Sequence, residues 1–123
     1  MQFLTSSKVN EIIQLANNYY GNESRSEIIG SKELGDAVTK ELSNPARHAL
    51  YEAIKSLTPQ EKAELEALML IGRGYDGDDM DAWGTMYEAA LMHKDLVHYV
   101  ASKKYLAKYL ENGLATVNAA TAS

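Results

Sequence analysis

Four aspartates in the stretch 76–81 are the side chains whose type and spacing most suggest chemistry: Asp76, Asp78, Asp79 and Asp81. Closely spaced carboxylates can ligate a divalent cation, but a calcium-binding loop also needs glycine at its sixth position and glutamate at its twelfth. In a loop that starts at Asp76, these two positions hold Asp81 and Tyr87. Aspartates here also fit caps and favourable charges at the start of a helix. We therefore expect no metal ion, with Asp76, Asp78 and Asp79 as weak candidates.

Arg73 lies between Gly72 and Gly74 and is a candidate for binding an anion or the carboxylate of a partner. Two structural roles compete with this function. The guanidinium can hydrogen-bond the last carbonyls of a helix that ends at Gly72, or it can pair with a carboxylate such as Asp76 or Glu88. The sequence leaves all three roles open.

The three histidines, His48, His93 and His98, form no recognisable catalytic or metal-binding pattern. His93 and His98 are five residues apart, which is about 140° around a helix, so they cannot share one helical face. The sequence contains no HExxH, GxSxG or GxGxxG motif, no phosphate loop and no cysteine. We expect no catalytic residue and no cofactor, and a protein without enzymatic activity is the favoured interpretation.

Tyrosine is the dominant aromatic residue, with eight tyrosines against one phenylalanine. Near the C-terminus three tyrosines alternate with three lysines: Tyr99, Tyr105 and Tyr109 with Lys103, Lys104 and Lys108. Tyrosines at the edge of a core explain this pattern, and so does a binding surface, because tyrosine is enriched at protein interfaces. We take Tyr105 and Tyr109 as candidate binding residues.

Composition indicates one globular domain covering residues 1–123, with 46% hydrophobic residues and a net charge of −5. Residues 60–88 contain eight acidic and two basic residues, whereas residues 89–123 contain four lysines and two acidic residues. We expect the acidic stretch to form a solvated face, or a patch for a basic partner such as the last helix of a second copy. Nucleic acid is an unlikely partner for such a chain. No signal peptide or membrane span is recognisable, so we expect a cytoplasmic bacterial protein.

The positions of apolar residues predict an all-α fold: a single compact bundle of five or six helices around a central helix at residues 59–71. Thr58, Pro59 and Glu61 form a capping box with proline in the first turn, and Gly72 is expected to end the helix. The C-terminal half of this helix is apolar all round and should be buried. Its N-terminal half is expected to face water, with the side chains Glu61, Lys62, Glu64 and Glu66.

Other helices are expected on both sides of this one. A first helix follows the caps at 5–7, with the buried face Val9, Ile12, Ile13, Ala16 and Tyr20. After a polar loop at 21–33 we expect helices at 32–42 and 46–56. Asp78 or Asp79 should cap a helix with the stripe Met80, Trp83, Tyr87, Ala90 and Leu91. Gly84 within it suggests a closely approaching backbone.

The chain should end with a short helix at 96–101 and a long last helix. Asp95 is the expected cap of the first and Ser102 that of the second. The last helix should bury Leu106, Tyr109, Leu110, Leu114 and Val117. Residues 118–123 are small and polar, and we expect a frayed tail there.

Residues 46–114 resemble a family of small uncharacterised bacterial proteins, a domain of unknown function. The resemblance is carried by these segments: 53–57 (AIKSL), 58–61 (TPQE), 67–69 (ALM), 72–74 (GRG), Trp83, Ala89 and 105–114 (YLAKYLENGL). Residues 1–45 are then a variable N-terminal helix and linker before this core. The resemblance implies an all-helical domain and brings no activity with it.

The leading functional hypothesis is a non-enzymatic module for protein–protein interaction, which binds another protein or a second copy of itself. The alternative is a small-molecule or anion-binding domain, or a cryptic enzyme, centred on Arg73 and the loop Asp76–Asp81. Trp83 is the fourth candidate binding residue, because a pocket formed by Arg73, Trp83 and a tyrosine would favour this alternative. A third hypothesis is an inhibitor protein of phage type.

Overall fold

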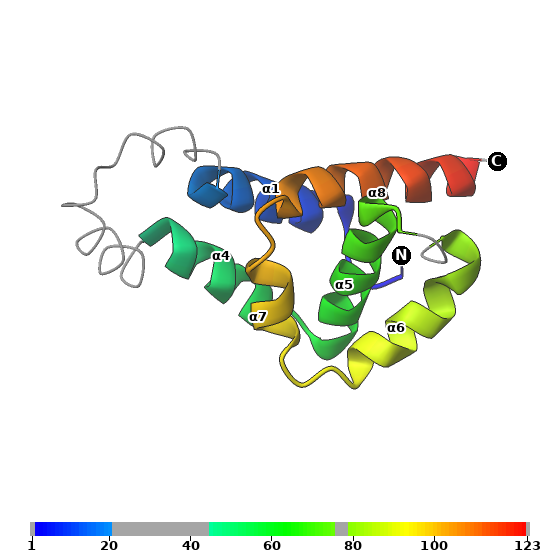
Figure 1. The fold of residues 1–123 in the computed structure, drawn as a ribbon, viewed down its shortest axis with the longest axis horizontal. Helices are drawn as coiled ribbons and strands as arrows, with labels where there is room; N and C mark the ends of the chain where they lie inside the picture. The colour runs from blue at the N-terminus through cyan, green and yellow to red at the C-terminus, as the bar shows by residue number, and fades with distance from the viewer. Residues whose placement is uncertain (1, 21–44, 76–78, 123) are drawn as a thin grey trace.

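The computed structural model describes residues 2–20, 45–75 and 79–122. In these residues the chain is helical and contains no strand, which confirms the all-α prediction (Figure 1). The elements are α1 (Ser6–Tyr20), α4 (Pro45–Lys55), α5 (Pro59–Arg73), the 3-10 helix η2 (Met80–Ala82), α6 (Trp83–Leu91), α7 (Leu96–Ala101) and α8 (Leu106–Ala122). The predicted loop at 21–33 and helix at 32–42 lie outside the described residues.

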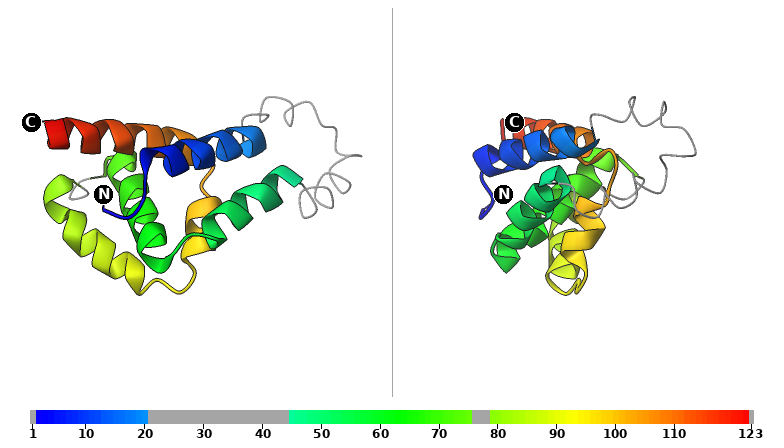
Figure 2. Two further views of the ribbon diagram at one scale, coloured as in Figure 1. Left: turned by 180° about the vertical axis from the view of Figure 1, so that it is seen from behind. Right: turned by 90° about the vertical axis from the view of Figure 1, so that its left-hand side faces the viewer.

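Helix α5 is the central helix, as predicted, and packs mainly against α8 and α6. Helices α1 and α8 lie side by side along one edge of the fold, and α4 packs against α1 and α7 (Figures 1 and 2). The largest fully buried side chains come from five helices: Val9, Leu50, Ile54, Leu65, Leu68, Met69, Val100, Leu106 and Leu110. Each such side chain contributes roughly 1.5–3 kcal/mol of hydrophobic stabilisation. Among the described residues, no helix is long and apolar enough to cross a membrane.

The start of α5 is the capping box that the sequence predicts. Glu61 N donates to Thr58 Oγ1 over 3.1 Å, and Thr58 N donates to Glu61 Oε1 over 3.0 Å. The predicted end at Gly72 is wrong, because the helix continues through Arg73 and Gly74 forms its cap with φ 74°. A left-handed conformation at this position is one that glycine adopts without strain.

Gly72 does not end α5 but allows it to pack closely against α8. A Cβ atom built on Gly72 would lie 1.5 Å from the carbonyl oxygen of Tyr109, and one built on Gly113 would lie 2.3 Å from that of Leu68. The backbones of α5 and α8 therefore touch where they cross. We expected such an approach at Gly84, and this prediction is wrong, since a Cβ there would meet nothing within 4 Å.

The prediction of a water-facing acidic half of α5 is also wrong. Glu61, Glu64 and Glu66 are only 6%, 2% and 6% exposed. The sequence predicted solvent exposure for these glutamates because burial of an unpaired carboxylate is energetically costly. Each of the three has polar partners from distant parts of the chain, so burial leaves none of them unsatisfied.

Several local predictions about the later helices need correction. Asp79 Oδ1 accepts from Ala82 N over 3.2 Å, so Asp79 caps η2 as expected. Asp95 lies at the start of α7 without a side-chain cap, and Ser102 ends α7 instead of capping α8. Leu91 is 45% exposed, whereas Met86 is buried. Helix α8 continues to Ala122, so residues 118–122 are helical.

Tyr20 ties the end of α1 to α7. Its hydroxyl donates to the carbonyl oxygen of Ala101 over 2.7 Å. Burial raises the pKa of Tyr20 to about 12, with a further increase from Tyr51 and an opposing effect of Arg47. The neutral hydroxyl is therefore the form that the fold stabilises.

Candidate functional site

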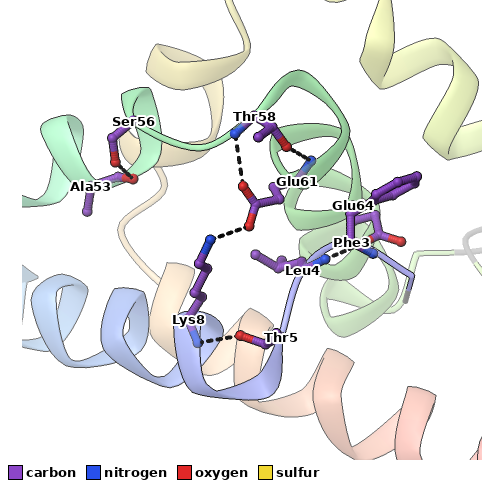
Figure 3. A network of polar contacts seen from close by, with 9 residues as sticks. All are labelled: Phe3, Leu4, Thr5, Lys8, Ala53, Ser56, Thr58, Glu61 and Glu64. Carbon is purple, nitrogen blue, oxygen red and sulfur yellow. Dashed lines mark hydrogen bonds and ion pairs between the residues drawn. The ribbon is translucent and has the colours of Figure 1, made fainter.

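Helix α5 carries three buried carboxylates, and the differences between their partners define the candidate sites of this protein. Glu61 is held by Lys8 of α1, whose Nζ lies 2.5 Å from Oε2 (Figure 3). The hydrogen bond from Lys8, followed by the one from the Thr58 backbone, lowers the pKa of Glu61. This carboxylate is a paired structural group that fastens α1 to the start of α5.

Glu64 binds the N-terminal segment through its main chain. Gln2 N donates to Oε2 over 2.6 Å, and Phe3 N and Leu4 N donate to Oε1 over 2.8 and 2.6 Å. Figure 3 shows this segment running past the Glu64 carboxylate toward α1. In the described part of the chain, the structure records no lysine, arginine or histidine paired with Glu64. Its partners among the described residues are the main-chain amides of residues 2–4.

Glu66 forms a carboxylate–imidazole pair with His93, which follows α6. His93 Nδ1 lies 2.6 Å from Glu66 Oε1, and the ring contacts Tyr99 edge-on with centroids 5.0 Å apart. A carboxylate on Nδ1 fixes the ring orientation and leaves Nε2 for another partner, as a general base requires. The structure records no hydrogen bond from His93 to a serine or threonine hydroxyl among residues 2–20, 45–75 and 79–122.

Arg73 lies beyond this pair, at the end of α5. Its Nη1 donates a long hydrogen bond of 3.5 Å to the hydroxyl of Tyr99, and its guanidinium lies 3.9 Å from the ring centroid of Tyr75. On the other side of Tyr99, Lys103 Nζ lies 4.1 Å from the ring centroid. Two cations and two tyrosines thus meet where α5 ends and α7 passes.

The start of α8 continues this aromatic and basic region. Tyr105 and Tyr109 contact each other with centroids 6.3 Å apart, and Lys104 Nζ lies 5.7 Å from the Tyr105 centroid. Gly72 touches the backbone of Tyr109, which brings the end of α5 next to these residues. We call this region the tyrosine–cation surface: Arg73, Tyr75, Tyr99, Lys103, Lys104, Tyr105 and Tyr109. Tyr75 and Tyr105 are 60% and 56% exposed.

Trp83, the remaining predicted binding residue, lies in a different place. It lines a cavity of about 380 Å³ together with Gln2, Phe3, Glu64, Met80 and Tyr87. Arg73 is not part of this lining, so this cavity is not the pocket of Arg73, Trp83 and a tyrosine that would favour the alternative function. Three of the four candidate binding residues contribute to the tyrosine–cation surface, and the fourth contributes to this cavity.

The acidic loop is described only in part. Asp76 and Asp78 lie outside the described residues, and Asp79 caps η2. Within the residues that the structure describes, no group of three or more histidine, aspartate or glutamate side chains is placed to hold a metal ion.

Sequence reasoning missed Glu64, Phe3 and the pair of Glu66 with His93. Their partners are far apart in the chain: Glu64 and Leu4 are 60 residues apart, and Glu66 and His93 are 27 apart. A single sequence contains no local signal for such contacts. The clustering of tyrosine and lysine at 99–109 was the one pattern that correctly indicated where residues of these types gather.

Comparison with known proteins identifies the family but no activity. Residues 47–119 match the family model described as protein of unknown function (DUF3775). Because this match spans more than half of the chain, the chain belongs to that family, and the resemblance to a domain of unknown function is confirmed. No curated protein and no solved structure matches the chain.

Proposed function

We propose that this member of the family is a helical protein-interaction module that binds an acidic segment of another protein, or of a second copy, through the tyrosine–cation surface. The observation that carries the proposal is the set of three cation–ring pairs at one corner of the fold: Arg73 with Tyr75, Lys103 with Tyr99, and Lys104 with Tyr105. Tyrosine and arginine are the residue types that contribute most to the energy of protein interfaces.

The charge of this surface indicates what kind of partner it fits. Lysine ammonium groups donate to carboxylates, and Lys103 and Lys104 lie beside the rings of Tyr99 and Tyr105. The exposed rings of Tyr75 and Tyr105 add apolar contact area at a small cost in side-chain entropy. A partner segment with glutamate or aspartate beside apolar residues satisfies both requirements.

The buried glutamates of α5 argue against one form of self-association. Three of the eight acidic residues in 60–88 are enclosed in the monomer, so they offer no acidic face to α8 of another copy. A homodimer would need other carboxylates, such as the exposed Asp79, Asp81 or Glu88. The binding of a different protein is the simpler form of the proposal.

The proposal is tested by NMR titration of the ¹⁵N-labelled protein with a short peptide of alternating glutamate and alanine. A lysine–alanine peptide of the same length is the control. We expect amide shifts at residues 73–75 and 99–109 with the glutamate peptide only, and weaker binding at higher salt. Equal shifts with both peptides, or shifts confined to other helices, would contradict the proposal.

Two variants sharpen this test. Tyr105→Ala should weaken binding of the glutamate peptide roughly tenfold, since interface tyrosines often carry such energies. Met92→Ala removes an apolar side chain that is 84% exposed and lies outside the tyrosine–cation surface, so it should leave the affinity unchanged. Light scattering during size-exclusion chromatography at low and high salt separates the two forms of the proposal, because a strict monomer in both excludes the homodimer.

The competing proposal of an anion site or enzyme at Arg73 has less support. The guanidinium already contacts Tyr75 and Tyr99, and the Glu66–His93 pair has no hydroxyl partner within the described residues. The cytoplasmic location and bacterial origin stay predictions from the sequence.

A further inference from the structure

The cavity beside Trp83 has a lining whose chemistry is not used by the tyrosine–cation surface. Three aromatic rings, a methionine, an amide and a carboxylate line an open cavity of about 380 Å³, and none of the lining residues is lysine, arginine or histidine. Cavities of this size bind small ligands in many proteins. The residue types of the lining therefore indicate the class of ligand.

The lining is rich in aromatic rings. Phe3 and Tyr87 are nearly parallel, with an interplanar angle of 9° and centroids 6.5 Å apart, and Trp83 lines the same cavity. The quadrupole of an aromatic ring attracts cations to its face, and tryptophan does so most strongly. Several rings around one space are the usual way in which proteins bind alkylated ammonium groups.

The charge of Glu64 is the second, independent observation. Of the three buried carboxylates on α5, Glu61 is paired with Lys8 and Glu66 with His93. In the described residues Glu64 accepts only main-chain amide hydrogens, and it is the one of the three that lines the aromatic cavity. A cation in the cavity would be attracted through space by this charge without displacing the amides.

We propose that the cavity formed by Phe3, Trp83 and Tyr87 over Glu64 binds a small organic cation, namely a quaternary or alkylated ammonium. The cationic group lies against the rings, and its charge is balanced by the Glu64 carboxylate. This inference does not depend on the tyrosine–cation surface.

The direct test compares choline with 3,3-dimethylbutan-1-ol, its neutral analogue with a tert-butyl group in place of the trimethylammonium. Binding of each to the wild-type protein is measured by calorimetry and by the fluorescence of Trp83, which is the only tryptophan in the chain. We expect choline to bind roughly tenfold more tightly than the neutral alcohol. Equal affinities, or no binding of choline, would overturn the proposal.

Variants locate the binding. Trp83→Leu should weaken choline binding roughly tenfold in calorimetry, because a ring face is lost. Tyr75→Leu is the matched control, an aromatic-to-leucine change outside the cavity, and should have no effect. Glu64→Gln should reduce the preference for choline over the neutral alcohol. Circular dichroism establishes whether each variant is folded. If a variant does not fold, the comparison of choline with the neutral alcohol on the wild-type protein still decides the proposal. Unchanged choline affinity in folded Trp83→Leu would overturn it.

Discussion

The substitution Gly72→Ala tests the closest contact in the fold. In α5 this change would place a Cβ 1.5 Å from the Tyr109 carbonyl oxygen, 2.5 Å from its carbon and 2.8 Å from Gly113 N. All three neighbours are backbone atoms of α8, so no side chain can rotate away. The helices must separate until the distance to the oxygen reaches about 3.4 Å, a movement of about 2 Å.

Two opposing energies determine the result. Overpacking of a core costs about 1–3 kcal/mol and occasionally more, and a separation of two whole helices belongs at the upper end of this range. Alanine gains about 1 kcal/mol over glycine in a helix interior. We expect Gly72→Ala to lower the free energy of unfolding by about 2–3 kcal/mol. A domain of this size has a total stability of roughly 5–15 kcal/mol, so the variant remains folded and measurable.

The matched control is Gly84→Ala in α6, where the added Cβ meets nothing within 4 Å. It should raise the free energy of unfolding by about 0.5 kcal/mol, because only the helix propensity changes and Gly84 lies in the first turn of α6, where this effect is smaller than in a helix interior. Both variants are compared with the wild type in urea unfolding followed by circular dichroism. If Gly72→Ala is as stable as Gly84→Ala, the close crossing of α5 and α8 is refuted.

Three further predictions follow from the buried polar groups. Glu64→Gln should lower the free energy of unfolding by about 1–2 kcal/mol and speed hydrogen exchange of the amides at 2–4, because it removes the charge that they bind. Unchanged exchange would contradict this role. The lowered pKa of Glu61 adds stability above its ordinary value of 4.5, and this stability is lost as the pH falls through the lowered value. Lys8→Met should therefore make urea stability less dependent on pH in this acidic range, and an unchanged slope would argue against the pair. The pKa of Tyr20, raised to about 12, makes the wild type lose stability as the pH rises from 10 toward 12. Tyr20→Phe should remove this alkaline loss and cost about 1 kcal/mol at neutral pH, and a persisting loss would assign it to other groups.

The sequence predicted those parts of the fold that depend on neighbours in the chain. The capping box of Thr58 and Glu61 and the apolar faces of α1 and α5 are local patterns, and the structure has them where they were predicted. The helix end is different. Gly72 looks like a terminator in the sequence, but the contact with α8 requires glycine there, and Gly74 ends the helix.

The buried glutamates of α5 could not be predicted either, because their partners lie far away in the sequence. A glutamate in an amphipathic pattern is assigned to water unless its partner is known, and Glu64 and Glu66 find theirs in the N-terminal segment and after α6. The candidate sites were predicted in part. Tyr105 and Tyr109 were grouped through the lysines beside them in the sequence, whereas no local pattern indicated that Trp83 lines a cavity with Glu64.

Charge reversal on the tyrosine–cation surface tests the proposed function most directly. The affinity of the glutamate–alanine peptide is measured by calorimetry for Lys103→Glu, whose side chain lies over Tyr99, and for Lys55→Glu at the exposed end of α4. The two variants have the same net charge. We predict that Lys103→Glu weakens binding roughly tenfold while Lys55→Glu changes it little. Equal losses would contradict the account, because they would show that the peptide responds to the overall charge of the protein and not to this surface.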